Sequence, residues 1–262
     1  MVRSKLADMS TWGPSNKVGA FYKSLEAVLL DLPEPVQADV TVAAQDILDT
    51  AKQTVEAALT AAQTMRRLRL AATGKKSVGR LSETDVDLLR SAVVFAGAGL
   101  DATLEQLVQD SVELMIDHDR HAKKAFRSWV STFLDHKDTG IDKAALVEIF
   151  LHDAPSPRAV LVSAYRKDLT GGSLQSVDKV EEICTALGIA EPSFRRDLAS
   201  NVQLREMFDA RNQIAHDLDL TDPDEPGRRR HDRTVRACTG WAQEALAVTQ
   251  GIVNRVAASV PG

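Results

Sequence analysis

The amino-acid sequence predicts an all-α protein, and both its composition and its periodicity indicate this class. Aromatic residues make up only 5% of the chain, whereas alanine and leucine are abundant; strands favour aromatic and β-branched residues, and helices favour Ala and Leu. Apolar residues recur at helical spacing along most of the chain, and no segment alternates for long between apolar and polar residues. A chain of 262 residues can also bury a substantial core.

The N-terminal part, residues 1–80, is expected to form a helical extension and a linker. A short helix is expected over Lys17–Leu32, ending at a Pro-Glu-Pro sequence, and a long helix over Val36–Ala72, which no Gly or Pro interrupts. Thr73–Arg80 contains two glycines and three positive charges, which is typical of a linker. We therefore expect a domain boundary there, with residues 81–262 forming a second helical domain.

The second domain is predicted to begin with a long helix that reaches about His118. Ser82 and Asp85 have the spacing of a capping box at its start. Gly97 and Gly99 lie in its middle, where each glycine costs about 1 kcal/mol relative to alanine. No Lys-Ser or Lys-Thr pair follows them, as a phosphate-binding loop requires. We expect instead that another helix packs closely against these glycines.

Capping signals delimit the later helices. Ser156 precedes a proline that suits the first helical position, and Gly188 suits a helix C-terminus. The loop Thr221–Gly227 separates the last two helices. The expected helices are Arg120–His136, Asp142–His152, Pro157–Lys167, Ser173–Leu187, Ser193 to about Leu220, and Asp232–Ala258.

The charge balance argues against a protein that binds nucleic acid over its whole surface. The net charge is −5, so any contact with RNA has to come from a local basic patch. Arg228, Arg229 and Arg230 are the candidates for such phosphate contacts. The alternative is a solvated helix start, because cations at a helix N-terminus gain nothing from the helix dipole.

Other features favour a cytoplasmic protein without metal or cofactor. Cys184 and Cys238 fall at apolar positions and are expected to be buried, reduced thiols. No run reaches the roughly 18 apolar residues of a membrane span, and the N-terminus lacks the apolar core of a signal peptide. Asp117–His121 holds two Asp and two His, but without diagnostic metal-ligand spacing, and we expect a polar helix end there.

The chemistry of the chain is expected to centre on Arg211-Asn212-Gln213-Ile214-Ala215-His216, within a helix. Metal-independent cleavage of RNA needs a base, an acid and a cation that holds charge on the phosphate. His216 is the motif side chain that titrates near neutrality, and Arg211 offers a fork of donors for phosphate oxygens. Asn212 can orient His216 or bond the phosphate.

Helical geometry separates the two charged candidates. Arg211 and His216 lie about 140° apart around an ideal helix and roughly 7.5 Å apart along it, whereas Asn212 and His216 are about 40° apart. Two copies that meet across a two-fold axis would place two Arg and two His around one cleft, so we expect a homodimer. In the structural alternative, Arg211 pairs with Asp209 or Asp217 and His216 caps the helix.

The Arg211-Asn212-x-x-x-His216 run, placed late in the chain before the last long helix, resembles the signature of the HEPN superfamily. The segment from about residue 81 to 260, some two thirds of the chain, is similar to HEPN proteins of the RiboL-PSP-like group, and Gly99-Leu100-Asp101-Ala102 matches an early helix of that group. The resemblance implies a HEPN-type helical bundle, metal-independent ribonuclease activity, composite dimer sites and a supporting role for Asp101.

Three functions remain open at this point. The first is an endoribonuclease, a toxin or antiphage effector that leaves a 2′,3′-cyclic phosphate and is held in check by an antitoxin or regulatory partner. The second is a non-catalytic interaction module that docks partners on the Ala-rich face of the long helix over Val36–Ala72. The third is a nucleic-acid binder that does not cleave.

Overall fold

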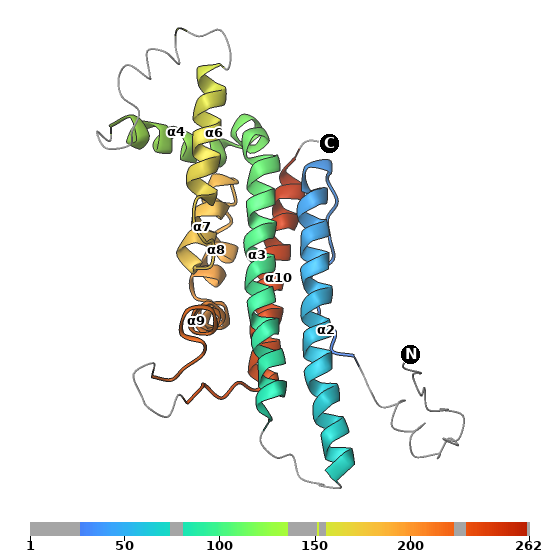
Figure 1. The fold of residues 1–262 in the computed structure, drawn as a ribbon. Coiled ribbons are helices and arrows are strands. Elements are labelled where there is room, and N and C mark those ends of the chain that lie inside the picture. The colour runs from blue at the N-terminus through green and yellow to red at the C-terminus, as the bar shows by residue number, and fades with distance from the viewer. Residues whose placement is uncertain (1–26, 74–80, 136–150, 152–155, 223–228, 261–262) are drawn as a thin grey trace, which may run out of the picture.

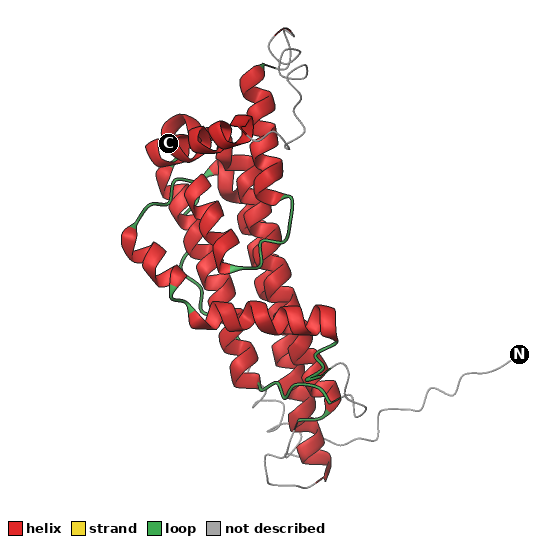
Figure 2. Cartoon of the chain, turned by 90° about the vertical axis from the view of Figure 1, so that its left-hand side faces the viewer, coloured by secondary structure: helices red, strands yellow, loops and turns green. Residues whose placement is uncertain are grey.

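The computed structural model describes residues 27–73, 81–135, 151, 156–222 and 229–260. The described residues form helices and no strand, which confirms the predicted all-α class (Figure 2). A single isolated bridge pairs Leu220 with Arg230 within this part of the chain. The helices are η2 (Asp39–Thr41), α2 (Val42–Thr73), α3 (Glu83–His118), α4 (Arg120–Asp135), α6 (Pro157–Thr170), α7 (Val177–Ala186), α8 (Pro192–Ala199), α9 (Val202–Asp217) and α10 (Val235–Ser259).

Helix α3 is the centre of the fold. It packs against α2 and α10, which run beside it as a long three-helix bundle, and also against α4, α6 and α9 (Figure 1). The shorter helices α6, α7 and α8 lie on the other side of α3 from α2 in Figure 1, where α9 is seen end-on. The helix α9 that carries the Arg-His motif therefore crosses the axis of the bundle.

The long helix α2 belongs to the common core rather than to a separate extension. Its buried residues Leu48, Val55 and Leu59 form one continuous hydrophobic cluster with residues of α3 and α10. In the described residues, the boundary expected at residue 80 lies between two helices, α2 and α3, that share this core. Three alanines of α2, Ala44, Ala51 and Ala62, are buried in the same way, whereas Ala43 and Ala57 are exposed.

Residues 27–38 are not the end of a helix. The helix expected over Lys17–Leu32 lies outside the described residues up to position 26, and its last residues have no helical structure. Their backbone N–H groups donate to side chains of neighbouring helices instead of to one another. The acceptors are Thr60 and Glu56 of α2 and Gln243 and Asn254 of α10. The segment is thus tied across the bundle, which a local sequence pattern cannot indicate.

Helix α3 begins and packs as predicted. Ser82 Oγ accepts from Asp85 N at 3.2 Å while Ser82 N donates to Asp85 Oδ2 at 3.1 Å, so the capping box is present. Close packing at the glycines is also confirmed. A Cβ built on Gly99 would lie 2.3 Å from the Cβ of Ala51 on α2, and one on Gly97 would meet side chains of Gln175 and Arg211.

The segment expected to be one helix from Ser193 to Leu220 is two helices, α8 and α9, and this prediction was wrong. Asn201 separates them: its Oδ1 accepts from Leu204 N at 2.9 Å and its Nδ2 donates to Glu244 Oε1 at 2.6 Å. An Asn side chain that bonds the backbone in this way competes with helix continuation and caps the next helix.

The remaining helices lie close to their expected positions, but α7 begins at Val177, capped by Ser176, rather than at Ser173. The helix expected over Asp142–His152 falls outside the described residues except for Leu151, and α10 starts at Val235, capped by Thr234, rather than at Asp232. Cys184 and Cys238 are buried and unpaired, and burial raises the pKa of each thiol to about 12. None of the described helices is both long enough and apolar enough to cross a bilayer.

Candidate functional site

The motif residues lie on the C-terminal half of α9, which is anchored by its N-terminal half. Leu204, Met207 and Phe208 are buried in the common core, and Asn201 caps the first turn. The helix is continuous to Asp217, so the ideal spacing of Arg211, Asn212 and His216 applies. Anchoring one half leaves the other half free to present polar side chains.

Arg211 is half-buried above Gly97 of α3. A Cβ on Gly97 would lie 3.3 Å from Arg211 Cγ, so the glycine makes room for the arginine stem. Arg211 Nη1 donates to Asn212 Oδ1 at 3.1 Å, whereas its buried Nε has no hydrogen-bond partner. No ion pair of the described residues includes Arg211, so the alternative pairing with Asp209 or Asp217 is not observed. Arg211 is a partly desolvated cation without a carboxylate.

Asp101 contacts a neighbour of the motif, Gln175, rather than the motif residues themselves. Its Oδ1 accepts from Leu174 N at 2.8 Å and its Oδ2 accepts from Gln175 Nε2 at 3.0 Å. Gln175 Oε1 is buried without a partner and lies 3.0 Å from the same Cβ position on Gly97 that Arg211 approaches. Asp101 therefore positions Gln175 beside Arg211, and among the described residues it makes no hydrogen bond to Arg211 or His216. An unpaired donor and an unpaired acceptor thus lie on either side of one glycine.

His216 and Asn212 are exposed, and both lie on one face of α9 because they are four residues apart. His216 occupies the last turn, and its side chain makes no hydrogen bond or ion pair within the described part of the chain. Arg211 lies on another side of the helix. The Cα positions of Arg211 and His216 thus lie on different sides of α9, although the Arg211 guanidinium reaches Asn212 on the face of His216.

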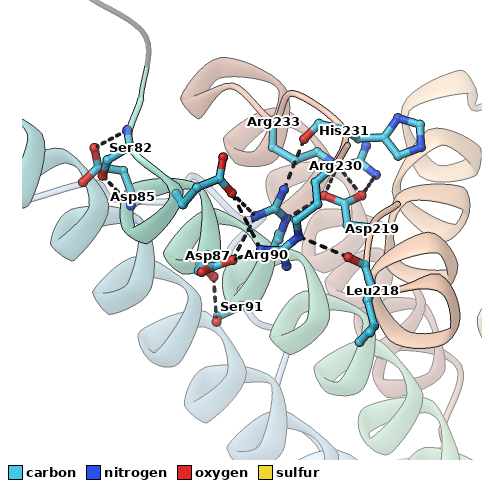
Figure 3. Close-up of polar contacts among 11 residues, drawn as sticks. Ser82, Asp85, Asp87, Arg90, Ser91, Leu218, Asp219, Arg230, His231 and Arg233 are labelled. Atoms are coloured by element: carbon cyan, nitrogen blue, oxygen red, sulfur yellow. Dashed lines mark hydrogen bonds and ion pairs between the residues drawn. The ribbon is translucent and has the colours of Figure 1, made fainter. Parts of the chain in front are cut away.

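A buried arginine network that sequence reasoning missed fixes the end of α9. Asp219, which is fully buried, accepts from Arg90 Nε at 2.6 Å and from Arg233 Nη2 at 2.5 Å (Figure 3). Arg233 Nη2 also donates to Gln213 Oε1 of α9 at 2.7 Å. Burial alone would lower the pKa of Arg90, but the hydrogen bonds and charges of Asp219 and Asp87 outweigh it and raise that pKa.

The backbone that follows α9 is held by hydrogen bonds of the same residue, Asp219. Leu218 and Asp219 both have positive φ, 53° and 61°, which turns the chain sharply away from the helix axis. Asp219 N donates to Gln213 O at 2.8 Å, and His231 N donates to Asp219 O at 2.9 Å. The sequence held one signal for this site: Arg90 falls on the buried stripe of α3 between Val86 and Val93, and a charge in such a stripe requires a partner.

The predicted basic cluster is only partly available. Arg228 lies outside the described residues. Arg229 is exposed, and its carbonyl accepts from Thr221. Arg230 is engaged: its Nε donates to Leu218 O at 3.1 Å, and its Nη1 lies 2.9 Å from Asp87 Oδ1 (Figure 3). A phosphate contact by Arg230 would require it to leave acceptors that hold the loop after α9.

The Asp117–His121 sequence forms the junction between α3 and α4. Asp117 pairs with Arg158 of α6, and Asp119 Oδ1 accepts from the backbone of His121 and Ala122 at 2.7 and 2.8 Å, which caps α4. In the portion of the chain that the structure describes, no three His, Cys, Asp or Glu side chains cluster closely enough to hold a metal ion.

Comparison with known proteins gives no family for this fold and site. A scan against protein-family models and searches of curated proteins and of solved structures found no match to the chain.

Proposed function

We propose that the protein is a metal-independent endoribonuclease in which Arg211, Asn212 and His216 act on the scissile phosphodiester. His216 takes the proton from the ribose 2′-OH or gives one to the leaving 5′-oxygen. Arg211 binds the phosphate oxygens as negative charge develops, and Asn212 holds the guanidinium. The product is a 2′,3′-cyclic phosphate. A cytoplasmic toxin or defence effector, restrained by a protein partner, is the biological role that fits such an activity.

The observation that carries this proposal is the unpaired state of Arg211. A half-buried guanidinium whose Nε has no partner, and which forms no ion pair among the described residues, is costly unless an anion satisfies it. The anion that a planar donor fork suits best is a phosphate or carboxylate. His216, exposed five residues later on the same helix, supplies the titratable group.

The proposed active unit is a two-fold homodimer. One chain supplies a single imidazole, whereas the reaction needs both an acid and a base, and a second copy would bring a second His216 and Arg211 to the same phosphate. Leu218, directly after α9, is 69% exposed, which leaves an apolar side chain for a second copy to cover. The alternative of a non-catalytic docking module could use only the outer side of α2, where Ala43 and Ala57 are exposed, because Ala44, Ala51 and Ala62 are buried in the core.

The decisive experiment compares cleavage of single-stranded RNA by the wild type and by His216→Ala and Arg211→Ala, with EDTA present. Each variant is expected to lose cleavage by at least about 100-fold without loss of stability. The matched controls are His118→Ala, another exposed histidine in a last helical turn, and Arg205→Ala on the same helix. Equal activity of His216→Ala and wild type would refute the proposal.

Mixing the two inactive variants tests the composite site. A heterodimer of Arg211→Ala and His216→Ala keeps one Arg211 and one His216, in different subunits. Cleavage is therefore expected to return on mixing and to follow the heterodimer fraction, which native mass spectrometry resolves from the two homodimers. Activity in a strictly monomeric wild type would contradict the shared site.

A further inference from the structure

A cavity of about 690 Å³ lies between α4, α6, α7 and α8, on the part of the molecule away from α2. Its lining combines apolar side chains such as Trp129 and Leu169 with the hydroxyl-bearing Ser128 and Thr185. Small-molecule sites typically have volumes of about 300–1,000 Å³, mostly apolar walls and a few converging polar groups. None of the residues Arg211, Asn212 and His216 lines it, so the cavity is distinct from the proposed RNA site.

Tyr165 gives this cavity a hydroxyl group without a protein hydrogen-bond partner in the described residues. The residue is only 4% exposed, and its ring lies 5.3 Å from Phe126 and 5.0 Å from Trp129 between ring centroids. Its hydroxyl makes no hydrogen bond with any residue in the described ranges, although Tyr165 lines the cavity. Burial raises the pKa of this hydroxyl, so it stays protonated and can donate. A hydroxyl on the cavity wall without a protein acceptor can donate to a ligand or to water.

The free charges around the cavity are positive. Lys124 of α4 and Arg195 of α8 both line it, and neither forms an ion pair with a described residue; Arg195 Nη1 donates only to the backbone oxygen of Glu181. The acidic lining residue, Glu182, is already paired with Lys179 at 2.7 Å. Two cations from separate helices therefore line the cavity without an ion pair to a described residue, whereas the two carboxylates near it have partners: Glu182 pairs with Lys179, and Asp168 accepts from Trp129 Nε1 at 2.7 Å.

We propose that this cavity binds a small organic anion. Its ring or hydrocarbon part fills the apolar floor near Trp129, its anionic group pairs with Lys124 and Arg195, and the Tyr165 hydroxyl donates to it. The wall favours a molecule with an apolar body over a bare inorganic ion, because an inorganic ion would leave apolar surface in water. The site does not depend on the proposed ribonuclease activity.

The test uses two fluorescent probes that share a ring system and differ in charge. 8-Anilinonaphthalene-1-sulfonate carries the anion, and N-phenyl-1-naphthylamine lacks it. The anionic probe is expected to bind the folded wild type at one saturable site and more tightly than the neutral probe. The double variant Lys124→Gln/Arg195→Gln is expected to weaken binding of the anionic probe by at least about tenfold and to leave the neutral probe unchanged.

Two further variants separate a specific site from a general effect of charge or of misfolding. Lys123→Gln/Arg196→Gln removes the same charge from the neighbouring positions of the same two helices, outside the lining, and is expected to bind the anionic probe as the wild type does. Tyr165→Phe removes one hydroxyl and is expected to weaken binding about three- to tenfold. Equal affinities of the wild type and the Lys124/Arg195 variant, or equal losses in the two double variants, would overturn the proposal.

Discussion

Two arginine sites flank α9, and they differ in how completely the protein satisfies them. Arg90 and Arg233 share the buried carboxylate of Asp219, and their remaining donors reach Asp87, Gln213 and a backbone oxygen. Arg211, on the same helix as Gln213, has a single protein acceptor in Asn212 and a buried Nε with none. Arg90 and Arg233, the completed pair, therefore have a buried carboxylate as a shared partner, whereas Arg211 has no carboxylate partner among the described residues.

Under the proposed function, this difference separates a structural use of arginine, in Arg90 and Arg233, from a functional use, in Arg211. A buried guanidinium that bonds a carboxylate fixes the backbone around it, and here it fixes the turn at Leu218–Asp219 after the last turn of α9. A partly buried guanidinium without a carboxylate cannot be explained by stability, because an unsatisfied buried donor costs about 1–3 kcal/mol. The completed pair therefore holds the helix end that carries His216, while Arg211 stays available to an anion.

Breaking the completed pair should have the largest effect. Asp219→Ala leaves Arg90 and Arg233 buried without their shared carboxylate, and we expect the free energy of unfolding to fall by about 3–5 kcal/mol. Urea denaturation followed by circular dichroism measures this. Asp209→Ala is the matched control, because Asp209 is exposed on α9, and it should change stability by no more than about 0.5 kcal/mol.

Replacing the two glycines of α3 by alanine should also have unequal effects on stability: the larger loss is expected at Gly99, in the packed core, and the smaller at Gly97, beside Arg211. Gly99→Ala places a Cβ 2.3 Å from the Cβ of Ala51 and should force α2 and α3 apart, at a cost of about 1–3 kcal/mol. Gly97→Ala meets the ends of flexible side chains, Gln175 Oε1 at 3.0 Å and Arg211 Cγ at 3.3 Å, so its effect on stability should be smaller. Thermal unfolding of the two variants compares them directly, and an equal loss would contradict the assignment.

The ion pair between Arg69 of α2 and Asp85 of α3 predicts a loss of stability of intermediate size that depends on pH. The bidentate hydrogen bond from Arg69, at 2.6 and 2.8 Å, holds the pKa of buried Asp85 below its ordinary value. We expect Asp85→Asn to cost about 1–2 kcal/mol at neutral pH, through the weakened pair and capping box. Because the folded pKa is depressed, this advantage of the wild type is present above the unfolded pKa of about 3.9 and disappears as the pH falls through the folded value.

Urea midpoints of the wild type and Asp85→Asn, measured from pH 7 to pH 2, should therefore converge at the acidic end. Midpoints that stay a constant distance apart over that range would show that the charge of Asp85 contributes nothing to the difference.

Local signals made much of the fold predictable. Ser82 and Asp85 are three residues apart, so the capping box could be predicted from the sequence alone. A glycine in the middle of a helix, Gly99, likewise predicted close contact with another helix. The extended course of residues 27–38 depends on acceptors as far away as Gln243, 212 residues along the chain. No local pattern contains that information. The break at Asn201 did have a local signal, the capping Asn, which the apolar periodicity around it outweighed.

The positions of the candidate site residues on their helix could be predicted, but the contacts that hold this helix could not. The helical placement of Arg211, Asn212 and His216 follows from their spacing, but the clamp on the end of their helix does not, because Arg90 and Asp219 are 129 residues apart. Asp101 illustrates the intermediate case. A supporting role for Asp101 was expected from its place in the sequence. Its hydrogen-bond partners, Leu174 and Gln175, could not be expected, because they lie 73 and 74 residues further along the chain.

The smallest expected change in stability is the most informative about Arg211. Arg211→Met keeps a long stem above Gly97 and removes the unpartnered Nε, so we expect the free energy of unfolding to stay level or to rise by up to about 1 kcal/mol. Arg233→Met, the matched change in the completed pair, should lower it by about 2 kcal/mol, because Asp219 loses a buried charged partner. If both variants lose the same stability, Arg211 is a structural residue after all. A stable Arg211→Met protein that no longer cleaves RNA would separate the need for the guanidinium in catalysis from any need for it in folding.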